Sequence, residues 1–251
     1  MKRTLIFVYQ LFIWLPVFLV ITILTALTVS VGCFCGGERF FSYYPAVWWS
    51  KLVCIITLCP VKVTGREKLS RKQSYVFVAN HQSAFDIFLI FGYLGQPIKW
   101  IMKKSLRKIP FVGKACELAG FIFVDNSSPK AAAKTIEEAK AKLKNGTSVV
   151  LFPEGSRTQT GRMDRFKKGA YQMALDLKLP IVSITLNGPY EVMPIHSYLI
   201  YPQKMEMIIH DPIPTEHIVV ENMRDAAVKI NELVTETRNR IESDLWEQYK
   251  N

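Results

Sequence analysis

The sequence lacks several motifs that would assign it to a nucleotide- or metal-dependent class. It has neither a Walker A sequence nor a G-x-G-x-x-G fingerprint, the two common loops that bind nucleotide phosphates. It also lacks a G-x-S-x-G elbow, the usual signal of a covalent acyl-serine route. The four histidines, at positions 81, 196, 210 and 217, are scattered, and most of the five cysteines lie in or beside apolar segments. We therefore expect no metal and no cofactor.

Charge is missing from one long stretch near the N-terminus. No charged residue lies between Thr4 and Gly37, and Leu5 to Leu24 is almost entirely apolar. Such a run meets the roughly 20 apolar residues that a helix needs to cross a bilayer. A cleaved secretory signal is the poorer interpretation, because its apolar region is typically about 7–15 residues and ends at an A-x-A site. We expect a retained membrane anchor.

A second apolar segment follows, from Pro45 to Cys59, and carries Trp48, Trp49 and Lys51. Its 15 residues are fewer than the roughly 20 that a helix needs to cross a bilayer. Tryptophans beside a lysine are typical of the headgroup layer. Two arrangements are open: a true span, or two helices that enter one leaflet and return. In both, residues 1–60 form N-terminal membrane-anchoring helices.

The chain is basic, with a formal net charge of +11, and 49% of its 251 residues are hydrophobic. This composition suits binding to nucleic acid or to an anionic membrane surface. Nucleic acid would explain the charge but not the apolar N-terminus. We therefore expect the lipid bilayer as a partner, and no nucleic acid.

From Val61 onward, strand and helix patterns alternate, which indicates an α/β domain with a mostly parallel sheet flanked by helices. We assign this domain to residues 61–251. Capping signals predict a helix at about 129–144, and apolar periodicity predicts a last helix at about 222–246. Strands are expected at 75–79, 97–102, 121–125, 147–152, 181–186 and 204–210.

A first polar motif, residues 80–86, follows the expected strand at 75–79 and contains His81 and Asp86. Acyl transfer to an alcohol needs a base near the hydroxyl, and a histidine has nearly the right basicity. A carboxylate improves such a base, because it fixes the tautomer and stabilises the imidazolium. Alone, H-x4-D is usually a strand-end histidine bonded to backbone, with an aspartate in the first turn of a helix.

A second polar motif, residues 152–158, follows the expected strand at 147–152. Its Arg157 can hold a phosphate through two parallel hydrogen bonds. We expect Glu154 to orient the loop and the arginine, and Ser156 to be a turn residue. A basic run without intervening acidic residues lies between the motifs; its members are Lys99, Lys103, Lys104, Arg107, Lys108 and Lys114.

Together these motifs resemble those of the glycerolipid acyltransferase family, most closely its lysophosphatidate acyltransferase branch, over about Val61 to Pro214. The resemblance implies transfer of a fatty acyl group from acyl-CoA or acyl carrier protein to the 2-hydroxyl of 1-acyl-glycerol 3-phosphate, forming phosphatidic acid. It also implies that His81 is the base and Asp86 its support. The implied substrate-binding residues are Lys103, with Lys104 as second choice, Glu154, Gly155, Ser156, Arg157, Thr158 and Lys167.

Two positions depart from the family pattern. Asn126 stands where an arginine is usual, which weakens selectivity for a phosphomonoester head, and Ser183 stands where a second proline is usual. Two alternatives therefore stay open: acylation of another lysophospholipid or of an aminolipid hydroxyl, or a catalytically silent lipid-binding membrane protein. Because both acyl donors are made in the cytosol, we expect the protein at the cell membrane with its active site facing the cytosol.

Overall fold

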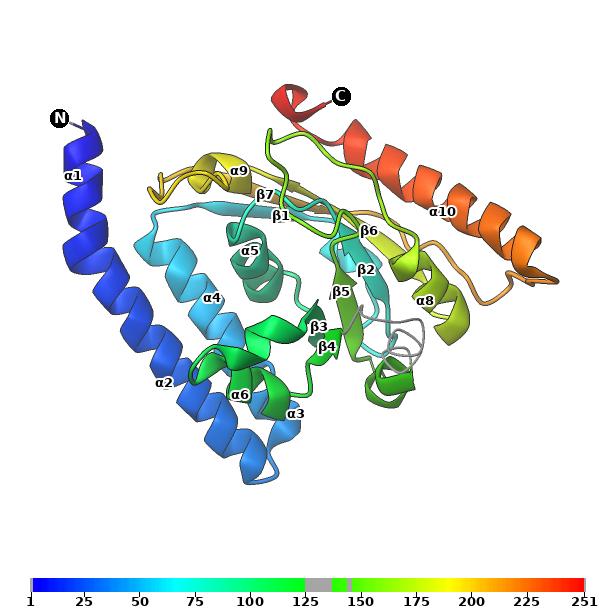
Figure 1. The fold of residues 1–251 in the computed structure, drawn as a ribbon, viewed down its shortest axis with the longest axis horizontal. Coiled ribbons are helices and arrows are strands. Elements are labelled where there is room, and N and C mark those ends of the chain that lie inside the picture. Colours follow the sequence, from blue (N-terminus) through cyan, green and yellow to red (C-terminus); the bar gives the residue numbers. More distant parts are fainter. Residues whose placement is uncertain (1, 125–136, 144–145, 251) are drawn as a thin grey trace.

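A computed structural model of the chain describes residues 2–124, 137–143 and 146–250. Within these residues a central sheet separates two groups of helices (Figure 1). One side carries α2 (Leu15–Phe34), α4 (Tyr44–Ile56), α5 (Phe85–Tyr93) and α6 (Val112–Leu118), and the other carries α8 (Gly169–Leu177) and α10 (Met223–Ser243). The strands are β1 (Val61–Thr64), β2 (Val76–Ala79), β3 (Ile98–Lys103), β4 (Ile122–Val124), β5 (Ser148–Leu151), β6 (Ile181–Asn187) and β7 (Met205–Ile209).

The helices vary from single turns to one of 21 residues. Residues 137–142 are also helical. The α-helices are α1 (Lys2–Tyr9), α2 (Leu15–Phe34), α3 (Glu38–Phe41), α4 (Tyr44–Ile56), α5 (Phe85–Tyr93), α6 (Val112–Leu118), α8 (Gly169–Leu177), α9 (Pro189–Val192) and α10 (Met223–Ser243). The other turns are the π-helical η1 (Gln10–Trp14) and the 3-10 helices η2 (Arg66–Lys68), η3 (Lys104–Lys108) and η4 (Glu247–Tyr249).

The described strands lie in the order β1-β7-β6-β2-β5-β3-β4. Strands β2 to β6 run parallel, whereas β7 is antiparallel to β6, and β1 is parallel to β7. The expected mostly parallel sheet is therefore confirmed, and each of the six expected strands is present. Strand β1 was not expected, because its Val-Lys-Val-Thr alternation is short and directly follows an apolar segment.

Two apolar layers cover the two faces of the sheet, because successive side chains of a strand point to opposite faces. Phe77 and Ala79 of β2 pack in the layer of α2, α4, α5 and α6. Val76 and Val78 pack in the layer of α8 and α10. All four side chains are fully buried, so β2 lies at the centre of the molecule.

The N-terminal helices expose much of their apolar surface. Residues Arg3–Phe34 form a continuous 32-residue helix. Its most apolar 18-residue stretch has a mean hydropathy of 2.5 and is only 11% buried. Length and composition suit it to cross or enter a membrane. Its inner side packs on α4, where Trp49 Nε1 donates to Thr22 Oγ1 at 3.0 Å and Trp14 Nε1 donates to Thr57 Oγ1 at 2.9 Å.

The same inner side joins these helices to the sheet domain, since Val53 and Cys54 of α4 lie in one buried cluster with Leu89 of α5. The boundary at residue 60 stays a prediction. The expected last helix is confirmed as α10, capped by Asn222, whose Oδ1 accepts from two backbone amides at 3.0 Å. The helix expected at 129–144 lies largely outside the described residues, although 137–142 are helical.

Candidate active site

The sheet brings the two polar motifs together. Strands β2 and β5 are parallel neighbours with Val78 opposite Leu151, so both end at the same edge of the sheet. His81 follows the end of β2 and Phe152 follows the end of β5. Lys103 ends β3, which is two strands from β2 and therefore roughly 10 Å away across the sheet. The parallel arrangement thus gathers residues that are far apart in sequence.

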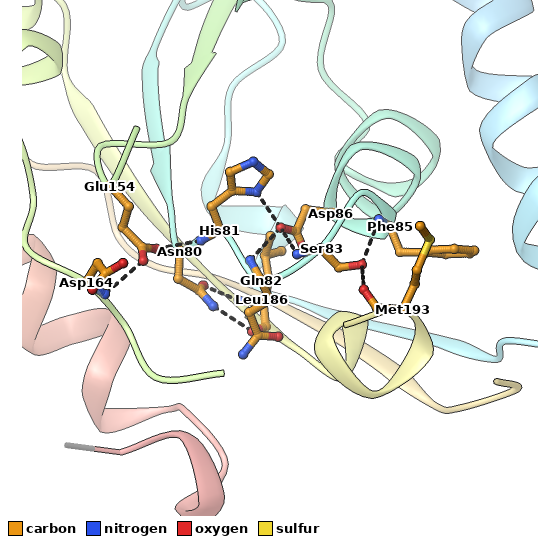
Figure 2. A network of polar contacts seen from close by, with 10 residues as sticks. All are labelled: Asn80, His81, Gln82, Ser83, Phe85, Asp86, Glu154, Asp164, Leu186 and Met193. Carbon is orange, nitrogen blue, oxygen red and sulfur yellow. Dashed lines mark hydrogen bonds and ion pairs between the residues drawn. The ribbon is translucent and has the colours of Figure 1, made fainter. Parts of the chain in front are cut away.

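His81 and Asp86 form a direct side-chain pair. Their Nδ1 and Oδ2 atoms are 2.7 Å apart (Figure 2), and the His81 side chain is 16% exposed while that of Asp86 is fully buried. A carboxylate beside Nδ1 favours the tautomer with the proton on that nitrogen, whose N–H donates a hydrogen bond to Asp86 Oδ2. The unprotonated Nε2 is therefore left to accept a proton from a substrate.

The first turn of α5 fixes Asp86. Its Oδ2 also accepts hydrogen bonds from the backbone amides of Gln82 at 2.7 Å and Ser83 at 2.9 Å. Two amides at a helix N-terminus favour a negative charge there, which offsets part of the cost of burying the carboxylate. The spacing of four residues between His81 and Asp86 is what lets one oxygen reach both the ring and these amides.

The backbone of His81 is held from both sides by the second motif. Its amide donates to Glu154 Oε1 at 2.6 Å, and its carbonyl accepts from the amide of Thr158 at 2.9 Å. The preceding Asn80 extends the sheet, because its side chain donates to the carbonyl of Leu186 and accepts from the amide of the same residue. Figure 2 shows the contacts of Glu154 with His81 and of Asn80 with Leu186.

Glu154 links the two motifs instead of contacting the arginine. One carboxylate oxygen accepts from His81, and the other accepts from the amide of Asp164 at 2.8 Å. Burial raises the pKa of Glu154 to about 7; the two amides lower it, and nearby Asp86 and Asp164 raise it. Within the described residues Glu154 therefore bonds to the backbone of His81 and of the loop, and its carboxylate makes no hydrogen bond or ion pair with Arg157.

An aromatic stack supports the imidazole. The ring of Phe152 lies 3.9 Å from that of His81 at an interplanar angle of 9°, and Trp100 stacks behind Phe152 at 5.6 Å. Together with the contact to Asp86, the stack restricts rotation of the imidazole about its side-chain bonds. Asn80 and Phe152 are the first residues of the two motifs, but the sequence does not indicate that they support His81.

The tip of the second motif is open to solvent. Gly155 and Ser156 are exposed, and Arg157 is half-buried without an ion pair to a described residue. Gly155 has a φ of +80°, and a Cβ at this position would collide with the ammonium of Lys167, so Lys167 lies directly over the turn. Two cations, Arg157 and Lys167, therefore flank one exposed turn.

The remaining predicted residues differ in their accessibility. Thr158 is buried, and its hydroxyl donates to the carbonyl of Arg162 at 2.6 Å, so it braces the loop. Lys103 is exposed at the end of β3, and Lys104 begins η3. Asn126 lies outside the described residues. Within the described part of the chain, no cluster of three or more His, Cys, Asp or Glu side chains could hold a metal ion.

Several known proteins are similar to this chain in sequence. The chain is similar to the chloroplastic 1-acyl-sn-glycerol-3-phosphate acyltransferase of Brassica napus, with 34% identity over 178 residues, 70% of this chain and 51% of that protein. It is also similar to the 1-acyl-sn-glycerol-3-phosphate acyltransferase of Saccharomyces cerevisiae, with 32% identity over 184 residues, 72% of this chain and 60% of that protein. The chain thus spans about half the length of the plant relative.

A solved structure has the same fold. The crystal structure of the 1-acyl-sn-glycerophosphate acyltransferase from Thermotoga maritima matches with a TM-score of 0.77 and 23% identity, over 98% of this chain and 100% of that chain. A sequence model of the Acyltransferase family matches residues 60–187, just over half of the chain, and this match includes both polar motifs. The chain therefore belongs to the Acyltransferase family.

Proposed function

We propose that the protein transfers a fatty acyl group from a thioester to the 2-hydroxyl of 1-acyl-glycerol 3-phosphate and so forms phosphatidic acid. The observation that carries the proposal is the 2.7 Å contact between His81 and Asp86 beside an open turn with Arg157. The names of the relatives in Brassica napus and Saccharomyces cerevisiae support this reaction and this acceptor.

In the proposed mechanism His81 acts as a general base. Its Nε2 takes the proton of the acceptor hydroxyl while the hydroxyl oxygen attacks the thioester carbonyl carbon. The tetrahedral intermediate then collapses, the carbon–sulfur bond breaks, and the imidazolium returns the proton to the leaving thiolate. Asp86 stabilises the imidazolium in the interval, because its charge lies 2.7 Å from Nδ1.

The cations of the site bind the acceptor phosphate in this proposal. Arg157 presents a planar fork of donors that fits phosphate oxygens, and a charge-assisted hydrogen bond contributes about 1.5–3 kcal/mol. Lys103 approaches from the end of β3, with Lys104 as the second choice. Lys167 adds positive charge over Gly155. The buried Glu154 and Thr158 act on the loop, not on the phosphate.

A panel of acceptors tests the proposed function. Purified protein in detergent would receive radiolabelled acyl-CoA or acyl carrier protein together with lysophosphatidate, lysophospholipids with larger heads, or an aminolipid. We expect labelled phosphatidic acid from lysophosphatidate with at least one donor. If the label enters only another lipid, the acceptor is wrong. If lysophosphatidate binds but no lipid is labelled with either donor, the protein is a lipid-binding protein.

We also propose that the N-terminal helices hold the protein at the cell membrane with the active site facing the cytosol. The exposed apolar surface of Arg3–Phe34 and the net charge of the chain support this placement. In a Cys35→Ser background, Glu67→Cys and Glu232→Cys would report on the sheet domain in intact cells. We expect a membrane-impermeant thiol reagent to label both positions only after permeabilisation, and labelling from outside would contradict the orientation.

A further inference from the structure

Helix α10 lies beyond residues 60–187, the segment that matches the family, yet it contacts the loop of the active site. The contact is made by Arg238. Its Nη1 donates to the carbonyl of Asp164 at 2.6 Å, and its Nη2 approaches the carbonyl of Met163 at 3.4 Å. The guanidinium also lies 5.7 Å from the ring centre of Phe166. One side chain therefore holds two consecutive carbonyls of the loop.

The held segment leads directly to the catalytic base. The carbonyl of Met163 and the amide of Asp164 belong to the same peptide unit, and that amide donates to Glu154 Oε2 at 2.8 Å. Glu154 Oε1 in turn accepts from the amide of His81 at 2.6 Å. A guanidinium on the carbonyl side of a peptide polarises its N–H and strengthens the hydrogen bond that the N–H donates. A continuous chain of polar contacts thus runs from α10 to His81.

We propose that Arg238 is a positioning residue for acyl transfer, acting on His81 through the 163–164 segment and Glu154. The inference rests on the proposed function. It adds a residue of the C-terminal helix to a site whose proposed catalytic and substrate-binding residues all lie between β2 and α8. Its physical basis is that a general base must keep its position relative to the reacting hydroxyl, and displacements of about 1 Å can cost up to roughly 100-fold in rate.

Arg240 provides a matched control on the same helix. Its Nη1 donates to the carbonyl of Asp211 at 2.7 Å, and its Nη2 pairs with Glu236 at 2.6 Å. The two arginines have similar exposure, 26% for Arg238 and 32% for Arg240. Arg238 Nε also lies 3.9 Å from Glu242, so each arginine contacts a loop carbonyl and a glutamate of α10. Asp211, however, follows β7, and its hydrogen bonds within the described residues are to Lys68 and Arg240, not to the loop of the site.

The experiment compares Arg238→Met, Arg238→Lys and Arg240→Met for kcat, for the acceptor KM and for amide hydrogen exchange. We expect Arg238→Met to lower kcat by roughly 10–100-fold with the acceptor KM within about twofold. Arg238→Lys should recover part of the rate, because a lysine keeps one donor and the charge. Amides of Asp164 and His81 should exchange faster in Arg238→Met and remain protected in Arg240→Met.

A double-mutant cycle separates positioning from general stability. In a Glu154→Gln background, Arg238→Met should change kcat by less than about twofold, because the linking carboxylate is already lost. Equal kcat losses in Arg238→Met and Arg240→Met, or a full Arg238→Met effect in the Glu154→Gln background, would overturn the inference. Inactivity of the wild type and of Arg240→Met would instead count against the proposed function, while the exchange of the two amides would still decide the role of Arg238.

Discussion

The two motifs of the site are built in opposite ways. On the side of β2 and α5, Asp86 is fully buried, and its Oδ2 accepts from two backbone amides and from the His81 ring. On the loop after β5, Gly155 and Ser156 are exposed and Arg157 has no ion pair within the described residues. In the proposed mechanism, the geometry of the base is therefore fixed before substrate arrives, whereas the positive charge proposed to bind the phosphate stays accessible to solvent.

This comparison predicts a division of kinetic effects. Changes on the buried side should lower kcat, because they disturb a base that acts mainly in the transition state. Changes on the open side should raise the acceptor KM, because they remove a contact made equally in the bound substrate and the transition state.

The largest effect is expected from Asp86→Asn. An asparagine has nearly the shape of the aspartate but no charge, so it cannot stabilise the imidazolium, and its amide can hold the wrong histidine tautomer. We expect kcat to fall by about 100-fold or more with the acceptor KM little changed. Steady-state kinetics with varied lysophosphatidate measure both constants. A kcat within about fivefold of wild type would show that His81 does not need this carboxylate.

The pH dependence of stability tests the link made by Glu154. Its pKa is raised from the usual 4.5 to about 7, so the folded state keeps a proton that the unfolded state has already lost in this range. Stability should therefore fall as pH rises through this window, by up to about 3 kcal/mol in the free energy of unfolding. Denaturant unfolding of wild type and Glu154→Gln between pH 4.5 and about 8 measures it. The free energy of unfolding should decline less steeply with pH in Glu154→Gln than in wild type. Identical slopes for the two proteins would mean that Glu154 does not titrate in this range.

A smaller effect is expected from Arg157→Ala. Loss of a charge-assisted contact worth about 1.5–3 kcal/mol should raise the acceptor KM by roughly 10–100-fold and leave the donor KM nearly unchanged. Arg162→Ala, an exposed arginine of the same loop, is the control and should change neither constant by more than about twofold. Equal rises for acceptor and donor would indicate that Arg157 supports the loop and does not bind the phosphate.

The fold was largely predictable from sequence because its strands are strongly patterned. All six expected strands and the helix capped by Asn222 are present. The antiparallel direction of β7 was not predictable, since the pattern of a strand does not record its neighbours. The short β1 has an alternation of only four residues, which carries too little signal on its own.

The site was predictable where its chemistry is local in sequence. His81 and Asp86 are in contact because a helical turn places them together. The H-x4-D spacing permits this contact, and the second motif at residues 152–158 distinguishes the pair from an ordinary strand end. The partners of Glu154 were not predictable, because 73 residues separate it from His81 and only the pairing of β2 with β5 brings them into contact. Arg238 has no sequence signal at all, since its contacts are to backbone carbonyls 74 and 75 residues away.

The most direct test of the account is the separation of binding from turnover in His81→Ala. General-base assistance contributes about 10²–10⁴-fold, so turnover of lysophosphatidate should fall at least 100-fold. Binding of lysophosphatidate, measured by calorimetry in detergent, should stay within about threefold of wild type, because the substitution leaves Arg157 and Lys103, the proposed phosphate ligands, in place. Turnover within a few-fold of wild type would contradict the central claim that His81 is the base, whatever the binding constant.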